Sequence, residues 1–213
     1  MKIKLIQNGK MPTRGTIGSS CIDCYARDLE LIKTTYNTWQ IKYYLGFAVQ
    51  LEDNQSLDVI PRSSICKKAL RLSNAKGEVD SDFRNEITAV FDVVGDVAKE
   101  INIFYEALLQ LDDLEFYKYL LEVEKSYNNN TSTDKIIKKD KHINAITIIK
   151  YSLSKNITDD TPQDQHIIPY ESIYLINERC CQAKLVQNIP FDTQIIHNIK
   201  QTNRGSYGST GNN

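Results

Sequence analysis

The segment that decides the fold reads Asn74-Ala75-Lys76-Gly77-Glu78-Val79-Asp80-Ser81-Asp82-Phe83-Arg84-Asn85-Glu86. Two aspartates flank a serine, between a glycine that permits a close backbone approach and an aromatic residue. This order is typical of a hairpin that holds a ligand. Taken alone, the segment fits an ordinary hairpin with solvated acids equally well.

Strand patterns lie on both sides of this hairpin. From residue 1 to about residue 94, short alternating apolar runs are separated by turn residues. Residues 45–49 form one such run before the polar residues 52–55, and residues 87–94 form another after Arg84-Asn85. Alternation with period two indicates strands with one buried face. The first 94 residues are therefore predicted to be all-β.

The periodicity changes after Gly95. Apolar residues recur there at the spacing of one helical face, namely at Ile101, Phe104, Tyr105, Leu108 and Leu109. A second set with helical spacing consists of Leu114, Tyr117 and Leu121. Both sets predict helices. Residues 136–151 are apolar but β-branched, which leaves helix and strand equally open there.

These patterns divide the chain into three parts. Residues 1–95 and 165–202 are predicted to form one β domain, because alternation returns at Ile167, Ile168, Tyr170, Ile173 and Leu175. Residues 96–164 are an inserted helical subdomain of about 70 residues. Residues 203–213 are too rich in glycine for a packed element and are expected to be a flexible arm.

Composition excludes several functional classes. The chain has 213 residues, a formal net charge of -1 and a pI near 6.3, which gives no broad basic field for a nucleic-acid backbone. No apolar run approaches the roughly 20 residues that span a bilayer. We therefore expect a small anionic ligand, no nucleic acid and no membrane. The location is predicted to be the cytoplasm, or the host cytoplasm if the AT-rich codon usage implied by many Lys, Asn and Ile residues is viral.

Five cysteines, an odd number, fit a reducing compartment better than a disulfide framework. Cys21 and Cys24 form a C-x-x-C pair, and Cys180 is followed directly by Cys181. They could form a zinc or redox site, or they could be small buried side chains on strands. We favour the second interpretation, because adjacent cysteines rarely bind one zinc ion well.

Two further segments carry phosphate-binding chemistry. Pro61-Arg62-Ser63-Ser64-Ile65 sets a guanidinium beside two hydroxyls, which suits phosphate oxygens but also suits a strand-to-helix turn with a capping serine. Arg204-Gly205-Ser206-Tyr207-Gly208-Ser209-Thr210-Gly211 is glycine-rich but lacks the lysine of a P-loop.

In their order and spacing, these segments resemble motifs of the homotrimeric dUTP pyrophosphatases. Ser20-Cys21-Ile22-Asp23-Cys24-Tyr25-Ala26 is similar to the family's A-G-x-D-L-x-A, and residues 61–65 resemble P-R-S-G-L. The hairpin residues 77–84 resemble G-x-I-D-x-D-Y-R. Glu178-Arg179-Cys180-Cys181-Gln182 resembles the core of G-x-R-I-A-Q, and residues 204–211 resemble R-G-x-G-G-F-G-S-T-G.

The resemblance implies a distorted jelly-roll β-barrel and Mg²⁺-dependent hydrolysis of dUTP to dUMP and pyrophosphate. Asp80 would activate the water that attacks the α-phosphorus. Phe83 would stack under the sugar. Asp23 would lie near Arg62 and would orient either this arginine or the hydrated metal, which it would contact only through water. The substrate-binding residues that the resemblance implies are Arg62, Ser63, Ser64, Asn74, Gly77, Val79, Phe83, Gln182, Arg204, Tyr207, Gly208, Ser209 and Thr210.

The resemblance also implies a homotrimer in which each active site is shared between subunits. Three departures from the motifs weaken these implications: Ser64 and Asn85 each replace a glycine, and the arm is two residues short between Gly205 and Tyr207. The insertion has no counterpart in the family's common core.

Two alternatives remain. A dCTP deaminase of the same fold also carries an R-S-S segment, but the position of its catalytic carboxylate holds Val90 here. The other alternative is a nucleotide-gated interaction protein, whose insertion binds an unknown protein partner.

Overall fold

The computed structural model describes residues 1–127, 140–154 and 172–189. Its elements are β1 (Lys2–Leu5), β2 (Ile22–Tyr25), β3 (Asp28–Lys33), β4 (Trp39–Tyr44), β5 (Phe47–Gln50), β6 (Gln55–Pro61), the 3-10 helix η1 (Ser63–Lys67), β7 (Leu70–Leu72), β8 (Gly77–Val79), β9 (Thr88–Val93), α1 (Gly95–Gln110), α2 (Asp113–Tyr127), α3 (Lys141–Ser154) and β10 (Arg179–Gln187).

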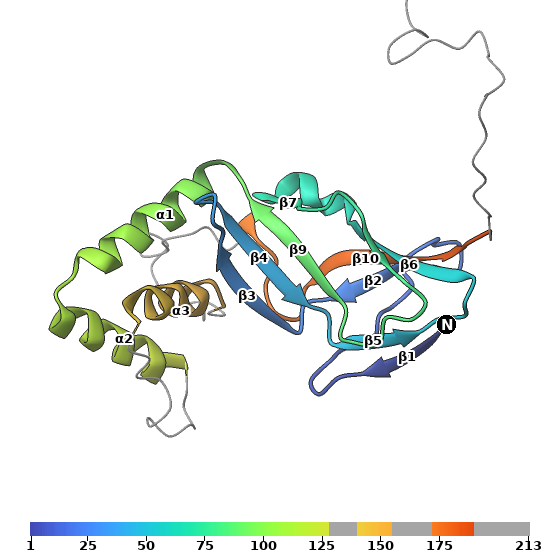
Figure 1. The fold of residues 1–213 in the computed structure, drawn as a ribbon, viewed down its shortest axis with the longest axis horizontal. Coiled ribbons are helices and arrows are strands. Elements are labelled where there is room, and N and C mark those ends of the chain that lie inside the picture. Colours follow the sequence, from blue (N-terminus) through green and yellow to red (C-terminus); the bar gives the residue numbers. More distant parts are fainter. Residues whose placement is uncertain (128–139, 155–171, 190–213) are drawn as a thin grey trace, which may run out of the picture.

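The strands form antiparallel sheets, two of them four-stranded (Figure 1). One has the order β2-β10-β6-β8 and the other the order β3-β4-β9-β7, while β1 pairs with β5. Because β10 lies between β2 and β6, a strand from the end of the described chain joins two strands from its first third. The prediction of a mainly β fold is confirmed.

The core of the β domain follows from alternation along the strands. In β4, Trp39, Ile41 and Tyr43 point inward and are almost fully buried. Phe91 of β9 meets Tyr43 with ring centroids 5.6 Å apart. Burying side chains of this size contributes about 1.5–3 kcal/mol each, so the period-two pattern is enough to specify which face of each strand packs.

The three helices lie together beside β3 and β4, at one end of the molecule (Figure 1). Tyr105 of α1 packs edge-on against Trp39 with ring centroids 5.2 Å apart, and its hydroxyl lies 2.7 Å from Nδ1 of His142 in α3. On α3, Lys150 pairs with Asp28 of β3 at 3.4 Å. Helices α1, α2 and α3 therefore share one hydrophobic core with the sheet.

The sequence left helix and strand equally open for residues 136–151. From Lys141 onward these residues form the helix α3, while residues 136–139 lie outside the described part. The alternation at Ile173 and Leu175 does not produce a strand, so that interpretation is wrong for residues 172–178. Side chains replace the ladder there: the amide of Leu175 donates to the Glu178 carboxylate at 2.9 Å. Ile167, Ile168 and Tyr170 lie outside the described residues.

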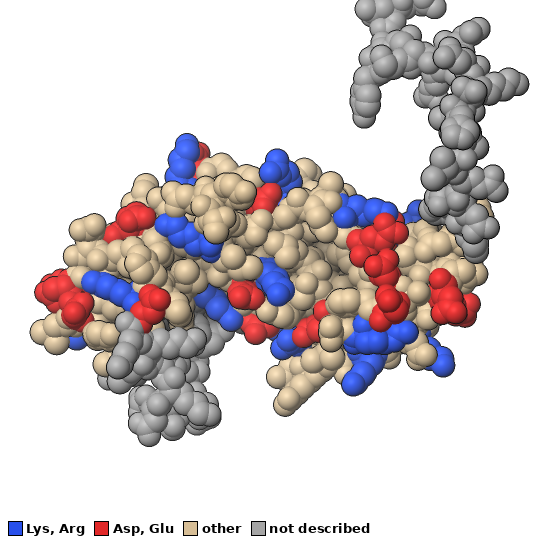
Figure 2. All heavy atoms as spheres, viewed as in Figure 1, with Lys and Arg blue, Asp and Glu red and all other residues tan. Residues whose placement is uncertain are grey.

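Lysines and arginines are interspersed with acids on the face shown in Figure 2, in agreement with the near-zero net charge. Among the described helices, none is long and apolar enough to cross a membrane. Cys24, Cys180 and Cys181 are fully buried on β2 and β10, the position that the packing interpretation expects.

Candidate active site

Three of the five sequence motifs meet around strand β10. Strand β10 pairs on one side with β2 and on the other with β6. In the register, Gln182 lies opposite Asp23 and also opposite Ile60. The first, second and fourth motifs are thus brought together by β-pairing across more than 150 residues of sequence.

Asp23 is the centre of this cluster, with a side chain only 8% exposed. One carboxylate oxygen accepts from Nε of Arg62 and from Nε2 of Gln182, both at 3.1 Å. The other oxygen accepts from Nη1 of Arg179 at 3.2 Å. A buried carboxylate is stable only when such donors compensate for its lost hydration.

The same contacts set the charge state of Asp23. Burial raises the pKa of its carboxyl, but the hydrogen bond from Gln182 and the charge of Arg62 lower it more. Hydrogen bonds from Arg62 and Arg179 act in the same direction. The net pKa lies below the usual value for aspartate, so the group remains ionised and holds both guanidinium groups in place.

Arg62 stands between β6 and η1, so the sequence segment is in fact a strand-to-helix turn as well as a candidate phosphate site. Its Nη1 donates to Oγ of Ser64 at 3.1 Å and to the carbonyl of Arg179 at 3.2 Å. Ser63 is exposed beside it. The guanidinium is therefore fixed by three different elements.

A hollow of about 330 Å³ opens beside Arg62 and Ser64. Its wall is formed by Tyr25, Arg62, Ser64, Lys68, Tyr174, Asn177, Glu178 and Arg179. Three of these side chains are cationic and one is acidic. An anion is the ligand that this charge pattern favours.

The hairpin of the third motif is attached to the same sheet by β8, with Gly77 opposite Val59 and Val79 opposite Leu57. Lys76 reinforces the pairing through Asp58 at 2.9 Å. Asn74 before β8 and Asp80 after it are exposed, and Phe83 is 38% exposed.

The register separates the hairpin from Arg62 of its own chain. Val79, next to Asp80, lies opposite Leu57, whereas Arg62 follows the far end of β6. Five residues of strand at 3.3 Å each span about 16 Å. One chain therefore does not bring Asp80 beside Arg62.

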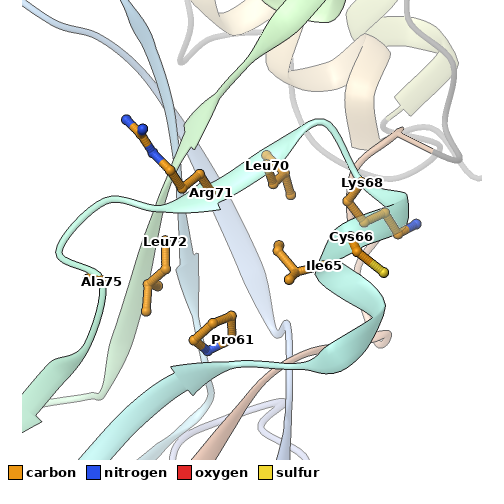
Figure 3. Close-up of a pocket in the computed structure, with 8 residues that line it drawn as sticks. All are labelled: Pro61, Ile65, Cys66, Lys68, Leu70, Arg71, Leu72 and Ala75. Atoms are coloured by element: carbon orange, nitrogen blue, oxygen red, sulfur yellow. The ribbon is translucent and has the colours of Figure 1, made fainter. Parts of the chain in front are cut away.

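A second hollow, of about 390 Å³, lies between η1 and β7. Figure 3 shows Ile65, Leu70, Leu72 and Pro61 lining it, while the guanidinium of Arg71 extends away. Its lining is mainly apolar, with Lys68 and Arg71 as its only cations.

The chemistry of Asp23 fits the indirect metal role only narrowly. A carboxylate offers about four lone-pair positions, and side chains occupy three of those of Asp23. Mg²⁺ usually keeps several waters and binds substrate phosphates rather than an all-protein cage. The described residues contain no group of three or more His, Cys, Asp or Glu side chains able to hold a metal.

Sequence reasoning omitted three residues from the site. Arg179 was part of a quoted motif without a role, and it now binds Asp23. No sequence motif includes Tyr174 or Lys68. Tyr174 in particular is 110 residues away from Ser64 in the sequence. The arm residues Arg204, Tyr207, Gly208, Ser209 and Thr210 lie outside the described residues.

Two curated proteins are similar to this chain in sequence. The deoxyuridine 5'-triphosphate nucleotidohydrolase of Rickettsia typhi is 29% identical over 98 residues, which are 45% of this chain and 66% of that protein. The enzyme of the same name from Hydrogenobaculum is 27% identical over 101 residues, 47% of this chain and 67% of that protein. The chain thus spans about two thirds of the length of these relatives. No family model matches it.

Solved structures show the same fold. A variant dUTPase of Staphylococcus bacteriophage 80alpha with dUpNHpp has a TM-score of 0.57 at 14% identity, covering 99% of this chain and 97% of that one. A variant dUTPase of phage phi11 of S. aureus, described with a structural Mg(II) ion, has a TM-score of 0.52 at 11% identity and covers 92% and 96%. The predicted dUTPase resemblance and its jelly-roll fold are confirmed.

Proposed function

We propose that this chain, which has the dUTPase fold and two dUTPase relatives in sequence, hydrolyses dUTP to dUMP and pyrophosphate. The observation that carries the proposal is the cluster around Asp23, where three motifs converge on an anion-binding hollow. The similarity to two nucleotidohydrolases and to a phage dUTPase with a bound nucleotide analogue supports this choice of substrate.

In the proposed reaction, Asp80 accepts a proton from the water that attacks the α-phosphorus. Its exposed position after β8 leaves the carboxylate accessible to a nucleotide. Phe83 offers an exposed ring face on which the sugar can stack. Asn74, Gly77 and Val79 would hold the base edge, as the hairpin places them along one strand end.

Phosphate binding is assigned to the opposite end of β6. Arg62, Ser63 and Ser64 supply donors there, and Gln182 reaches the same cluster through Asp23. When bound, Mg²⁺ would neutralise charge on the triphosphate, with water linking it to Asp23. The arm residues are proposed to close over the nucleotide.

The separation of about 16 Å along β6 supports an active site shared between subunits. Because Asp80 and Arg62 of one chain lie at opposite ends of this strand, a second copy must bring its hairpin to the first copy's phosphate cluster. We propose a homotrimer, in which this exchange closes symmetrically. Light scattering should give the mass of three chains, whereas a monomer with full activity would contradict the shared site.

The function is tested by following pyrophosphate release from each deoxynucleoside triphosphate with Mg²⁺. We expect dUTP to be the preferred substrate, and Asp80→Asn to keep nucleotide binding while losing turnover by about 10²- to 10⁴-fold. Glu78→Gln is the matched control, since this carboxylate is exposed on the same hairpin and pairs only peripherally with Lys76 at 3.4 Å.

Three outcomes would change the assignment. Near-normal turnover by Asp80→Asn removes that residue from the mechanism. Ammonia release from dCTP identifies the deaminase alternative instead. Nucleotide binding with no turnover of any triphosphate favours the interaction protein, whose partner would be sought with and without residues 96–164.

A further inference from the structure

Ser64 is where the second motif departs from its family, since a hydroxyl stands where P-R-S-G-L has glycine. In the structure this hydroxyl has two neighbours. Nη1 of Arg62 lies 3.1 Å from its Oγ, and the hydroxyl of Tyr174 lies 3.2 Å from it. All three side chains line the anion-binding hollow.

Hydrogen-bond chemistry restricts how these groups share protons. A guanidinium only donates, so Ser64 Oγ accepts from Arg62. Ser64 then has a second acceptor position and one proton left. If Tyr174 donates to the remaining acceptor position, the proton of Ser64 points away from both partners and toward the hollow.

We propose that Tyr174 is a positioning residue, whose hydroxyl together with Arg62 orients the Ser64 hydroxyl as a hydrogen-bond donor to the substrate's phosphates. This inference rests on the proposed function and assigns a task to the residue that replaces glycine. A phosphate oxygen in the hollow accepts the Ser64 proton, and its negative charge favours this arrangement over the one in which Ser64 donates to Tyr174.

Tyr174 is held firmly enough to do this. Its amide donates to the hydroxyl of Tyr43 at 3.2 Å, and the same hydroxyl donates back to the Tyr174 carbonyl at 2.9 Å. Tyr43 is fully buried in β4. On the other side, Lys68 bonds the carbonyl of Ile173 at 2.7 Å and lies 5.2 Å from the centre of the Tyr174 ring.

The phenol also remains in the form that can donate. Burial raises the pKa of Tyr174, and this outweighs the opposite effects of the Ser64 hydrogen bond and the Arg62 charge. At neutral pH the hydroxyl therefore keeps its proton.

The test is a double-mutant cycle of Tyr174→Phe and Ser64→Ala, read by calorimetric binding of two probes, a non-hydrolysable dUTP analogue and inorganic pyrophosphate. A lost hydrogen bond to an anion should weaken binding by about tenfold in either single variant. The double variant should bind no more weakly than Ser64→Ala, because Tyr174 acts only through Ser64. In both single variants the KM for dUTP should rise, whereas kcat should change little.

Tyr44→Phe is the matched control, because it removes a hydroxyl that bonds exposed Glu30 at 2.7 Å in the other sheet. It should bind both probes like the unmodified chain. Thermal unfolding of Tyr174→Phe and Tyr44→Phe should be alike, since a purely structural role would lower the melting temperature of the first alone.

The outcomes separate this inference from the proposed function. If dUTP is hydrolysed but Tyr174→Phe binds normally, or if the two losses add in the double variant, the inference is wrong and the function stands. If dUTP is not a substrate but pyrophosphate binding shows the same non-additivity, the inference stands without the function. Binding of neither probe by the unmodified chain overturns both.

Discussion

Replacing Asp23 by asparagine is the most direct test of the cluster that unites three motifs. Asparagine keeps the shape and one acceptor oxygen but removes the negative charge. Its amide also faces donors, so at least one of the bonds from Arg62, Arg179 and Gln182 is lost. The two guanidinium groups then lose the carboxylate that they share.

The expected loss of stability follows from how exposed each partner is. The Arg62 side chain is 20% exposed, so its bond to the carboxylate should approach the ~1.5 kcal/mol typical of charged hydrogen bonds. The Arg179 side chain is 52% exposed, and solvent screening reduces its share to about 0.5 kcal/mol. The free energy of unfolding should therefore fall by about 2 kcal/mol at neutral pH.

The pH dependence of this difference has a definite sign. The pKa of Asp23 is lowered in the folded chain, so its contribution is fully present above the unfolded pKa of about 3.9. It is lost as the pH falls through the lower, folded value. The difference in the free energy of unfolding between Asp23→Asn and the unmodified chain should thus be constant near neutrality and should disappear in acid.

Urea unfolding at pH 7 and below pH 4 measures both the loss of stability and its dependence on pH. The protein concentration is kept the same throughout, because the stability of an oligomer depends on it. Asp92→Asn is the matched control, since Asp92 also accepts from three side chains, Gln40, Ser73 and Arg71, but lies in the other sheet. It should lose stability without losing affinity for pyrophosphate, whereas Asp23→Asn should lose both. A loss below about 0.5 kcal/mol for Asp23→Asn, or one that does not change with pH, would refute the reasoning.

Two further predictions concern the scaffold. Gly46 has φ +74° and a Cβ there would lie 2.5 Å from Cα of Gly9, so Gly46→Ala should cost about 3 kcal/mol or more. Gly95→Ala, at φ +68° with open space, should cost only about 1 kcal/mol of strain; equal losses in urea unfolding would contradict the clash. Replacing residues 96–164 by a short turn should leave dUTP hydrolysis measurable. It should lower the melting temperature, because Trp39 loses its contact with Tyr105. Complete loss of activity in a folded trimer would place the insertion in the active site.

The strands and the hairpin could be predicted from the sequence because each depends on local pattern. Alternation in residues 39–44 specifies the inward face of β4, and the helical spacing after Gly95 specifies the buried face of α1, where Ile101, Tyr105 and Leu108 are indeed buried. The approach of Asp23 to Gln182 could not be derived in this way, because it depends on how β2 and β10 pair. The family resemblance implied only that Asp23 lies near Arg62.

Other features had no local signal at all. The alternation at Ile173 and Leu175 resembles a strand, yet this loop is held by the buried hydroxyl of Tyr43 and by backbone hydrogen bonds to Ala69 and Ala26. Asn177 stands at the glycine of G-x-R-I-A-Q and adopts φ +69°. Asparagine tolerates this conformation better than most residues, so the departure from the motif keeps the turn that leads into β10.

The position of α1, α2 and α3 explains how a large helical segment can coexist with the cluster around Asp23. The helices pack on β3 and β4, whereas Asp23 lies in the sheet formed by β2, β10, β6 and β8. Strand β4 contacts both regions: Trp39 meets α1, and four residues further on Tyr43 anchors Tyr174. These side chains are about 13 Å apart along a fully packed strand, so β4 supports the two regions at separate positions. Substitutions on the exposed surface of the helices, such as at Ile103, can therefore accumulate without moving Ser64, whereas substitutions at Trp39 or Tyr43 change the strand that supports it.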